Sequence, residues 1–178
     1  MIGELFRSLG LGAAEDTRQD TETVAQIASG LQGVPAERAR FLAAFAYLLG
    51  RVAFADHDVS PEERQTMESF LAGQGVSSGQ AGEVVNLAVR ATGSHGAAED
   101  YQIAREFEAI ATREEKLQLL RALFTVSAEH GITTLEDNEI SRIARVLRLE
   151  RADVSALRIE FRDALNSRQP STPRTGQV

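Results

Sequence analysis

Apolar residues recur at spacings of three and four along almost the whole chain, and the alternation typical of strands is absent. Such spacing places apolar side chains on one face of a helix. The pattern predicts helices over about 21–31, 35–56, 60 to 73 or 75, 80–92, 98–110, 113–129, 134–148 and 151–165. Asp20 is the expected N-cap of the first helix, and Pro35 is expected in the first turn of the second. We therefore expect an all-α fold.

The two ends of the chain differ from this helical region. A short apolar stripe with helical spacing consists of Ile2, Leu5, Phe6 and Leu9. Because isolated helices this short are marginal in water, we expect the stripe to dock on the domain, a second protomer or a membrane surface. The C-terminal residues carry two of the four prolines and almost no apolar residues, which predicts disorder. The predicted organisation is an arm and linker over 1–19, one helical domain over 20–165 and a disordered tail over 166–178.

An internal repeat runs through the helical region. Residues 55–63 align without a gap to residues 128–136, at an offset of 73, and each copy lies between a long apolar helix and a shorter amphipathic one. We expect about seven helices in two pseudo-twofold helix–acidic turn–helix repeats, over about 35–93 and 98–165, with 40–75 superposing on 113–148. The predicted core positions are Phe45, Leu48, Leu49, Val52, Met67, Phe70, Leu71, Leu120, Phe124, Ile140, Ile143 and Leu147.

The repeated turns carry a pattern of a known family. The first reads Ala55-Asp56-His57-Asp58 with a glutamate at Glu63, and the second reads Ala128-Glu129-His130-Gly131 with a glutamate at Glu136. This pattern resembles the TerB-like family, whose hallmark is an Ala-Asp-Gly type turn with a Glu seven residues after the Asp, repeated in the second half. The resemblance implies an all-helical fold and a role in binding divalent metal or a partner, and it implies no established reaction.

The match differs from the family pattern at two places. His57 replaces the usual Gly in the first turn. In the second turn, the gapless alignment places Glu129 opposite Asp56. An alignment with a one-residue deletion before Glu136 places His130 there instead, and the sequence leaves both alignments open.

A metal site is one explanation of the acidic turns. Acidic residues after a helix C-terminus are disfavoured by the helix dipole, and their presence in both copies suggests a compensating cation. A nearby Arg51, exposure to water, or a local turn made by Asp itself would also explain them. The candidate ligands are Asp56, Asp58, Glu63, Glu129 and Glu136, with His57 and His130 as secondary candidates. Carboxylates and backbone carbonyls suit Mg²⁺, Ca²⁺ or Mn²⁺, and the histidines would shift the preference toward Zn²⁺ or Ni²⁺.

The two glutamates also have a purely structural explanation. Ser60-x-x-Glu63 and Thr133-x-x-Glu136 are capping boxes, in which the glutamate reaches back to the N-cap backbone. Thr112-x-x-Glu115 has the same form without an acidic turn before it, so the chain uses this box elsewhere for structure alone. Similarly, both histidines are explained as exposed turn residues.

Composition excludes several classes of function. The 178 residues carry a net charge of −7 and no cysteine, which argues against a nucleic-acid surface and excludes thiolate chemistry. The longest apolar run has ten residues, too few for a membrane span, and no secretory signal is recognised, so we expect a cytoplasmic protein. No catalytic motif is present. We expect a non-enzymatic TerB-like domain that binds a divalent cation in a metal, tellurite or stress response. The alternative is a helical scaffold that binds a protein partner or, through residues 2–9, a membrane surface or a second copy.

Overall fold

The computed structural model describes residues 21–94 and 96–167, which fold into nine α-helices and two short 3-10 helices. In chain order these are α2 (Glu22–Ala28), α3 (Ala36–Ala53), η1 (Phe54–Asp56), α4 (Pro61–Gly73), α5 (Ser78–Thr92), α6 (Ala97–Ile110), α7 (Arg113–Ser127), η2 (Ala128–His130), α8 (Thr134–Val146), α9 (Arg151–Glu160) and α10 (Arg162–Ser167). These ranges contain no strand, so the all-α prediction is confirmed. The helices outnumber the expected seven, in part because the predicted last helix is divided at Phe161.

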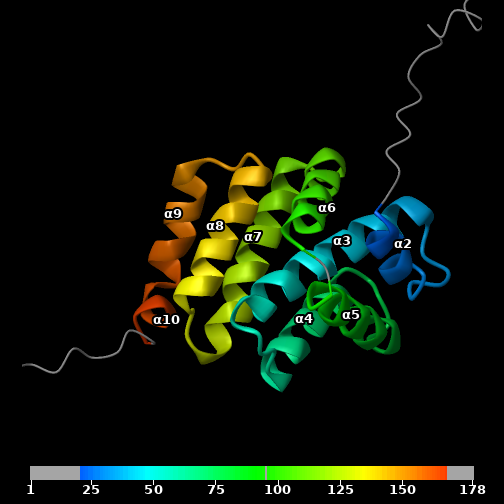
Figure 1. Ribbon diagram of the computed structural model, residues 1–178, viewed down its shortest axis with the longest axis horizontal. Coiled ribbons are helices and arrows are strands. Elements are labelled where there is room, and N and C mark those ends of the chain that lie inside the picture. Colours follow the sequence, from blue (N-terminus) through cyan, green and yellow to red (C-terminus); the bar gives the residue numbers. More distant parts are fainter. Residues whose placement is uncertain (1–20, 95, 168–178) are drawn as a thin grey trace, which may run out of the picture.

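Helix α3 is the centre of the fold. Its apolar residues lie on all sides, and thirteen of its eighteen residues are buried. A helix that is apolar all round needs neighbours on every side. Accordingly α3 contacts α2, α4, α5, α6, α7 and α8. Figure 1 shows it passing between the group formed by α7, α8 and α9 and the group formed by α2 and α5.

One continuous apolar core surrounds α3. All the predicted core positions are buried except Phe70, which is half-buried and packs against the core from its edge. Phe41, Phe45 and Phe107 form an aromatic cluster between α3 and α6, with ring centroids 5.2 to 6.2 Å apart. Aromatic pairs at these distances add to the burial of area.

The first described helix differs from its predicted bounds. Its N-cap is Thr21, whose hydroxyl accepts a 3.3 Å hydrogen bond from Val24 N. Asp20, the predicted cap, lies outside the described residues. The helix ends at Ala28 instead of Leu31, because Gly30 and Leu31 turn back with bonds between residues three apart.

The other helix ends also differ by a few residues from the predicted bounds. The two long helices predicted to reach 56 and 129 end as α-helix at Ala53 and Ser127, and the 3-10 helices η1 and η2 complete them. Such 3-10 turns are common at helix C-termini. Helix α8 ends at Val146, two residues before the predicted end. Helix α10 reaches Ser167, while the apolar arm and residues 168–178 lie outside the described residues.

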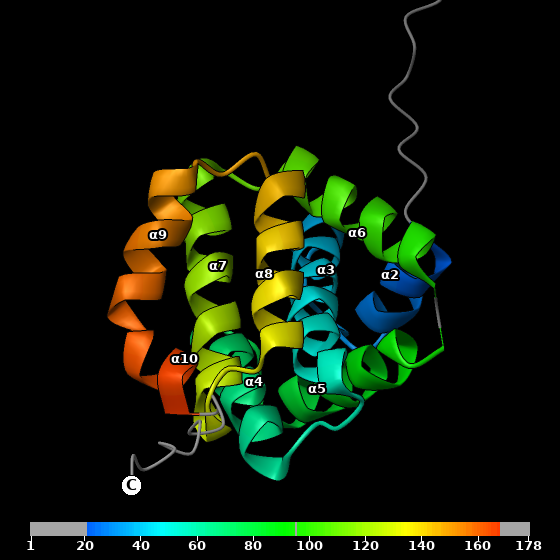
Figure 2. The ribbon, with the colours of Figure 1, turned by 60° about the vertical axis from the view of Figure 1, so that its left-hand side comes forward.

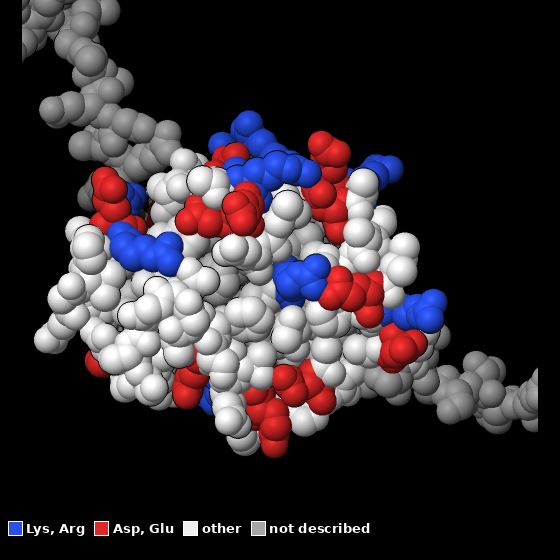
Figure 3. Space-filling model, turned by 180° about the vertical axis from the view of Figure 1, so that it is seen from behind, with Lys and Arg blue, Asp and Glu red and all other residues white. Residues whose placement is uncertain are grey.

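The surface of the described part carries charges of both signs. Figure 3 shows the face opposite that of Figure 1, where most basic groups lie beside acidic ones and neutral areas separate these clusters. Among the described helices, none has the length and apolar character that crossing a membrane requires.

Figure 2 shows α9, α7 and α8 standing side by side at one end of the molecule.

Candidate metal site

Two helix–turn–helix segments carry the acidic residues predicted as ligands. In the first, η1 follows α3 and His57 ends the turn with a φ of 69°. In the second, η2 follows α7 and Gly131 ends the turn with a φ of 85°. Glycine is the usual residue at positive φ because it lacks a Cβ atom. The two segments share one order of elements, and the near-twofold rotation between them stays a prediction.

The shape of the turns selects one of the two alignments. Asp56 and His130 are each the third residue of a 3-10 helix, directly before the residue at positive φ. Glu129 comes one position earlier and corresponds to Ala55. His130 therefore occupies the place of the acid in the second turn, which is one residue shorter before the next N-cap.

Both predicted capping boxes are present. Glu63 N donates to Ser60 Oγ over 3.1 Å, and Glu63 Oε2 accepts from Ser60 N and Oγ at 2.8 and 2.9 Å. The Thr133–Glu136 box has the corresponding distances of 3.2, 2.7 and 2.7 Å. Both glutamates are buried, with exposed fractions of 7% and 3%. The structural explanation of the two glutamates is therefore correct, and any metal would have to bind carboxylates that already cap helices.

The geometry of the boxes leaves part of each carboxylate available. In both boxes the N-cap backbone and hydroxyl groups donate to the same oxygen, Oε2. The other oxygen, Oε1, takes no part in the box. An oxygen outside the capping box on each of two buried carboxylates matches the hard-oxygen donors of Mg²⁺, Ca²⁺ and Mn²⁺.

The two glutamates lie within electrostatic range of each other. Burial raises the pKa of Glu63, and the charge of Asp56 raises it further, while the hydrogen bonds from Ser60 and the charge of His130 act in the opposite sense. Burial also raises the pKa of Glu136, and the charge of Glu63 adds to the shift, against the hydrogen bonds from Thr133. The turns from the two halves thus bring their carboxylates into one acidic region.

Asp56 has a local structural role as well. Its Oδ1 accepts a 3.3 Å hydrogen bond from the backbone N–H of Asp58, which is the local turn that aspartate commonly makes. The side chain of Asp58 is exposed. Of these two predicted ligands, Asp56 is the one whose charge raises the pKa of the buried Glu63.

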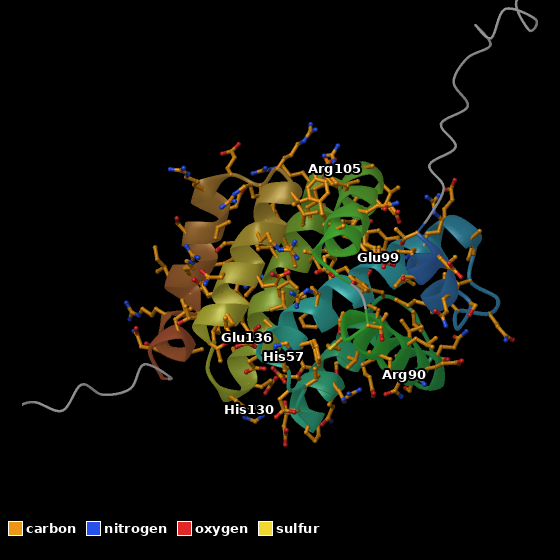
Figure 4. All side chains as sticks on the ribbon, in the orientation of Figure 1. His57, Arg90, Glu99, Arg105, His130 and Glu136 are labelled. Carbon is orange, nitrogen blue, oxygen red and sulfur yellow. The ribbon has the colours of Figure 1, made fainter. Side chains whose placement is uncertain are left out.

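Glu129 and His130 join the second turn to α4. Glu129 Oε1 accepts a 2.6 Å hydrogen bond from Thr66 Oγ1, and His130 Nε2 lies 3.4 Å from Glu62 Oε2. Both residues are exposed. Figure 4 shows His57, His130 and Glu136 at the same end of the molecule. Glu129 is therefore engaged in a contact between the halves.

Ser127, which the sequence analysis did not single out, completes this region. Its side chain is 2% exposed, and its Oγ has no hydrogen-bond partner of good geometry. The hydroxyl lies near Glu136 and lowers the pKa of that carboxyl, against the larger effect of burial. A buried hydroxyl that makes no well-formed hydrogen bond is uncommon and calls for an explanation. Its position at the last residue of α7, directly before the acidic turn, is the signal in the sequence that would have identified it.

The side chains are not arranged as a finished metal site. Within residues 21–94 and 96–167, no three His, Asp or Glu side chains are placed to hold one ion together. The donor set nevertheless fits a hard cation, since Glu63, Glu136 and Asp56 supply carboxylate oxygens and Ser127 supplies a neutral one. A cation would therefore draw these side chains closer than they stand in the structure.

A second buried polar cluster joins α3, α6 and α8. Asp100 is 4% exposed, and its carboxylate accepts from Tyr47 Oη at 2.6 Å and from Arg51 Nε at 2.8 Å. Arg142 Nη2 lies 3.4 Å from the same carboxylate, and Arg142 also pairs with Glu139. Arg51, which could have neutralised the acidic turn, is paired here with Asp100 and lies 3.6 Å from Glu139.

The sequence contains a signal for this cluster that the analysis did not use. Asp100 lies on the same helical face as Ile103, Ala104 and Phe107, so an acid interrupts the apolar stripe of α6. Tyr47 and Arg51 are four residues apart on α3. An ionisable residue within an apolar stripe indicates a buried partner, because an unpaired buried charge is very costly.

Comparison with models of known protein families assigns the chain to a family. The family described as tellurite resistance protein TerB matches residues 41–159, which is more than half of the chain and spans both acidic turns. The search of curated proteins found no match, and the search of solved structures found none. The fold, the two repeated turns and this match agree, and the chain belongs to the TerB family.

Proposed function

We propose that the protein is a non-enzymatic TerB domain that binds a divalent cation between its two acidic turns. The feature that carries the proposal is that Glu63 and Glu136, two buried glutamates from different halves, lie close enough for the negative charge of Glu63 to raise the pKa of Glu136. Bringing two carboxylates together out of water raises the free energy of the folded state unless a proton or a cation compensates. Mg²⁺, Ca²⁺ or Mn²⁺ would supply this compensation, and Zn²⁺ would be favoured only with His130 as a ligand.

The residues divide into inner and outer groups. Glu63, Glu136 and Asp56 would bind the cation, with Ser127 or a water as neutral donors. Asp58, Glu129 and His57 are exposed and would contribute to attraction of the cation from solution. We further propose that this cation binding serves a metal-linked or tellurite-linked stress response in the cytoplasm.

The test is thermal unfolding of untagged protein with and without millimolar Mg²⁺, Ca²⁺, Mn²⁺ and Zn²⁺. Cation at about 100 times Kd should stabilise the fold by about 2.7 kcal/mol, which raises Tm by several degrees. Glu63→Gln and Glu136→Gln should abolish most of this rise, although glutamine keeps the capping box. Asp56→Asn should weaken it while leaving the metal-free protein at least as stable, because an acid leaves the C-terminal end of a helix dipole.

The chain offers a matched control. Glu115 stands in a third capping box, where Glu115 Oε2 accepts from Thr112 N and Oγ1 at 2.8 and 2.9 Å, and no acidic turn precedes it. Glu115→Gln should therefore leave the response to metal unchanged. A Tm that no cation moves would contradict the proposal and favour the alternative function, a metal-free scaffold for a protein partner or a membrane. In that case deletion of residues 1–12 should alter oligomeric state or membrane partitioning.

The link to stress has its own test. A strain carrying Glu63→Gln and Glu136→Gln should lose growth on tellurite or on excess metal, relative to a strain carrying Glu115→Gln at the same protein level. Equal growth of the two strains would separate cation binding from the stress response.

A further inference from the structure

The α8–α9 groove is a second concave surface, separate from the acidic turns. It lies between α8 and α9, both of which pack against α7, and has a volume of about 500 Å³. Figure 2 shows α9 and α8 on either side of α7. Its charged lining residues are arginines: Arg145 from α8, and Arg151 and Arg158 from α9. In a chain with a net charge of −7, a concave surface with this lining is unexpected.

Two of the three arginines are unpaired within the described structure. Arg158 Nη2 lies 2.8 Å from Asp137 Oδ2 and donates a 2.7 Å hydrogen bond to Ser141 Oγ. Arg145 and Arg151 are exposed, and neither side chain forms a hydrogen bond or ion pair with another described residue. Even the acid two residues from Arg151, Asp153, pairs instead with Arg113 of α7 at 3.0 Å.

The spacing of these residues aims them at the same groove. Arg151, Val154, Ser155 and Arg158 recur at i, i+3, i+4 and i+7, which makes one face of α9. Ser141 and Arg145 are four residues apart on α8 and lie on one face of that helix. The groove is thus bordered by guanidinium groups and serine hydroxyls, with the side chains of Leu149 and Val154 as apolar walls.

We propose that the α8–α9 groove binds a small organic molecule that carries a phosphate monoester. Arginine pairs with phosphate oxygens through parallel hydrogen bonds, and a phosphate has three acceptor oxygens for two unpaired guanidinium groups. The volume is in the range of small-molecule sites, and the apolar walls suit an organic group attached to the phosphate. The already paired Arg158 of α9 and its partner Ser141 of α8 link the two helices that line the groove.

The experiment is a titration of ¹⁵N-labelled full-length protein with phenyl phosphate at low ionic strength, followed by NMR. Saturable shifts are expected at the amides of 141–145 and 151–155. Inorganic phosphate, which lacks the apolar group, and benzoate, which carries one charge, should each bind more weakly, benzoate by at least about tenfold. The absence of saturable shifts with phenyl phosphate would overturn the proposal.

The variants separate the groove from general charge attraction. Arg145→Gln with Arg151→Gln should weaken phenyl phosphate binding by at least about tenfold, and the fold should persist because neither side chain is bonded. Arg162→Gln is the matched control for the single variant Arg151→Gln, since each removes one positive charge and the Arg162 side chain is 73% exposed on α10. Equal weakening by the control would contradict a specific site. If the double variant fails to fold, Arg151→Gln alone and the wild-type shift map decide.

One further comparison distinguishes the source of the phosphate. Sedimentation with vesicles of phosphatidylcholine and phosphatidylglycerol tests a lipid headgroup. Vesicle binding that depends on Arg145 and Arg151, without binding of phenyl phosphate, would assign the groove to a membrane surface and overturn the proposal.

Discussion

The phenol of Tyr47 donates a 2.6 Å hydrogen bond to Asp100 Oδ1, and both side chains are buried. The other carboxylate oxygen, Oδ2, accepts from Arg51 Nε at 2.8 Å. The carboxylate therefore has a partner on each oxygen, as a buried charge requires. Since Tyr47 and Arg51 come from α3 and Asp100 from α6, this cluster fixes α6 on the central helix.

Removal of one member of the Asp100 cluster should destabilise the fold. Tyr47→Phe leaves Asp100 Oδ1 without a donor, and we expect a loss of about 1–3 kcal/mol in the free energy of unfolding. Asp100→Asn removes the buried carboxylate that Arg51 and Arg142 share and leaves them only Glu139, with an expected loss of about 3–5 kcal/mol. Urea unfolding followed by circular dichroism measures both. Tyr101→Phe, at a side chain that is 54% exposed, is the matched control and should change stability by less than about 0.5 kcal/mol.

The same contact predicts a loss of stability in alkali. Burial, followed by the hydrogen bond and the charge of Asp100, raises the pKa of Tyr47 far above its ordinary value of 10.0. The unfolded chain releases this proton near pH 10 while the folded chain keeps it, so the contribution is complete below pH 10 and is lost as the pH rises further. In the Tyr101→Phe variant, Tyr47 is the remaining tyrosine of the two. Its absorbance at 295 nm should rise only together with unfolding, and a rise in the folded protein near pH 10 would contradict the contact.

The raised pKa values of Glu63 and Glu136 predict that the stability of the fold depends on pH in the acidic range. Burial raises both folded-state pKa values above 4.5, so the folded protein holds protons that the unfolded chain has released. The stability from these protons is complete below about pH 4.5 and is lost as the pH rises through the folded-state pKa values. The metal-free Glu63→Gln, Glu136→Gln variant should therefore gain stability relative to the wild type as the pH rises from 4.5 to 7.

Stabilisation by the cation should instead increase as the pH rises, since cation binding requires deprotonated carboxylates. The Tm rise caused by the cation should increase over the same pH interval. A difference in stability between variant and wild type that stays constant from pH 4.5 to 7 would show that the two glutamates do not titrate in this range.

The sequence predicted those features that depend on local pattern. Helical spacing located the helices, and the repeated turn located both capping boxes, because a box needs only residues three apart. It did not predict the cluster of Asp100, whose partners lie 42 to 53 positions away and are brought together by packing alone. Ser127 was missed for the same reason, since its burial depends on how α7 packs.

The second turn shows where pattern alone is insufficient. The gapless alignment needed no deletion and paired Glu129 with Asp56. The structure places His130 there, because in both turns three residues of 3-10 helix come directly before the residue at positive φ. A deletion of one residue in a loop costs little, whereas a shift of the helix end would change which side chains are buried.

The left-handed residue of the first turn gives the last prediction. His57 has φ 69° and ψ 13°, where a Cβ atom costs about 1–2 kcal/mol, and its ring packs edge-on against Phe54 with centroids 5.4 Å apart. His57→Ala keeps the strain and loses the ring contact, whereas His57→Gly loses the contact and removes the strain. We therefore expect the Gly variant to be about 1 kcal/mol more stable than the Ala variant in urea unfolding. Gly131→Ala, at φ 85° and ψ 129°, should cost at least as much as the strain at His57, because that region is reserved for glycine. If His57 is a turn residue and not a ligand, both His57 variants will retain the full rise in Tm with cation, and loss of that rise in both would make His57 a ligand instead.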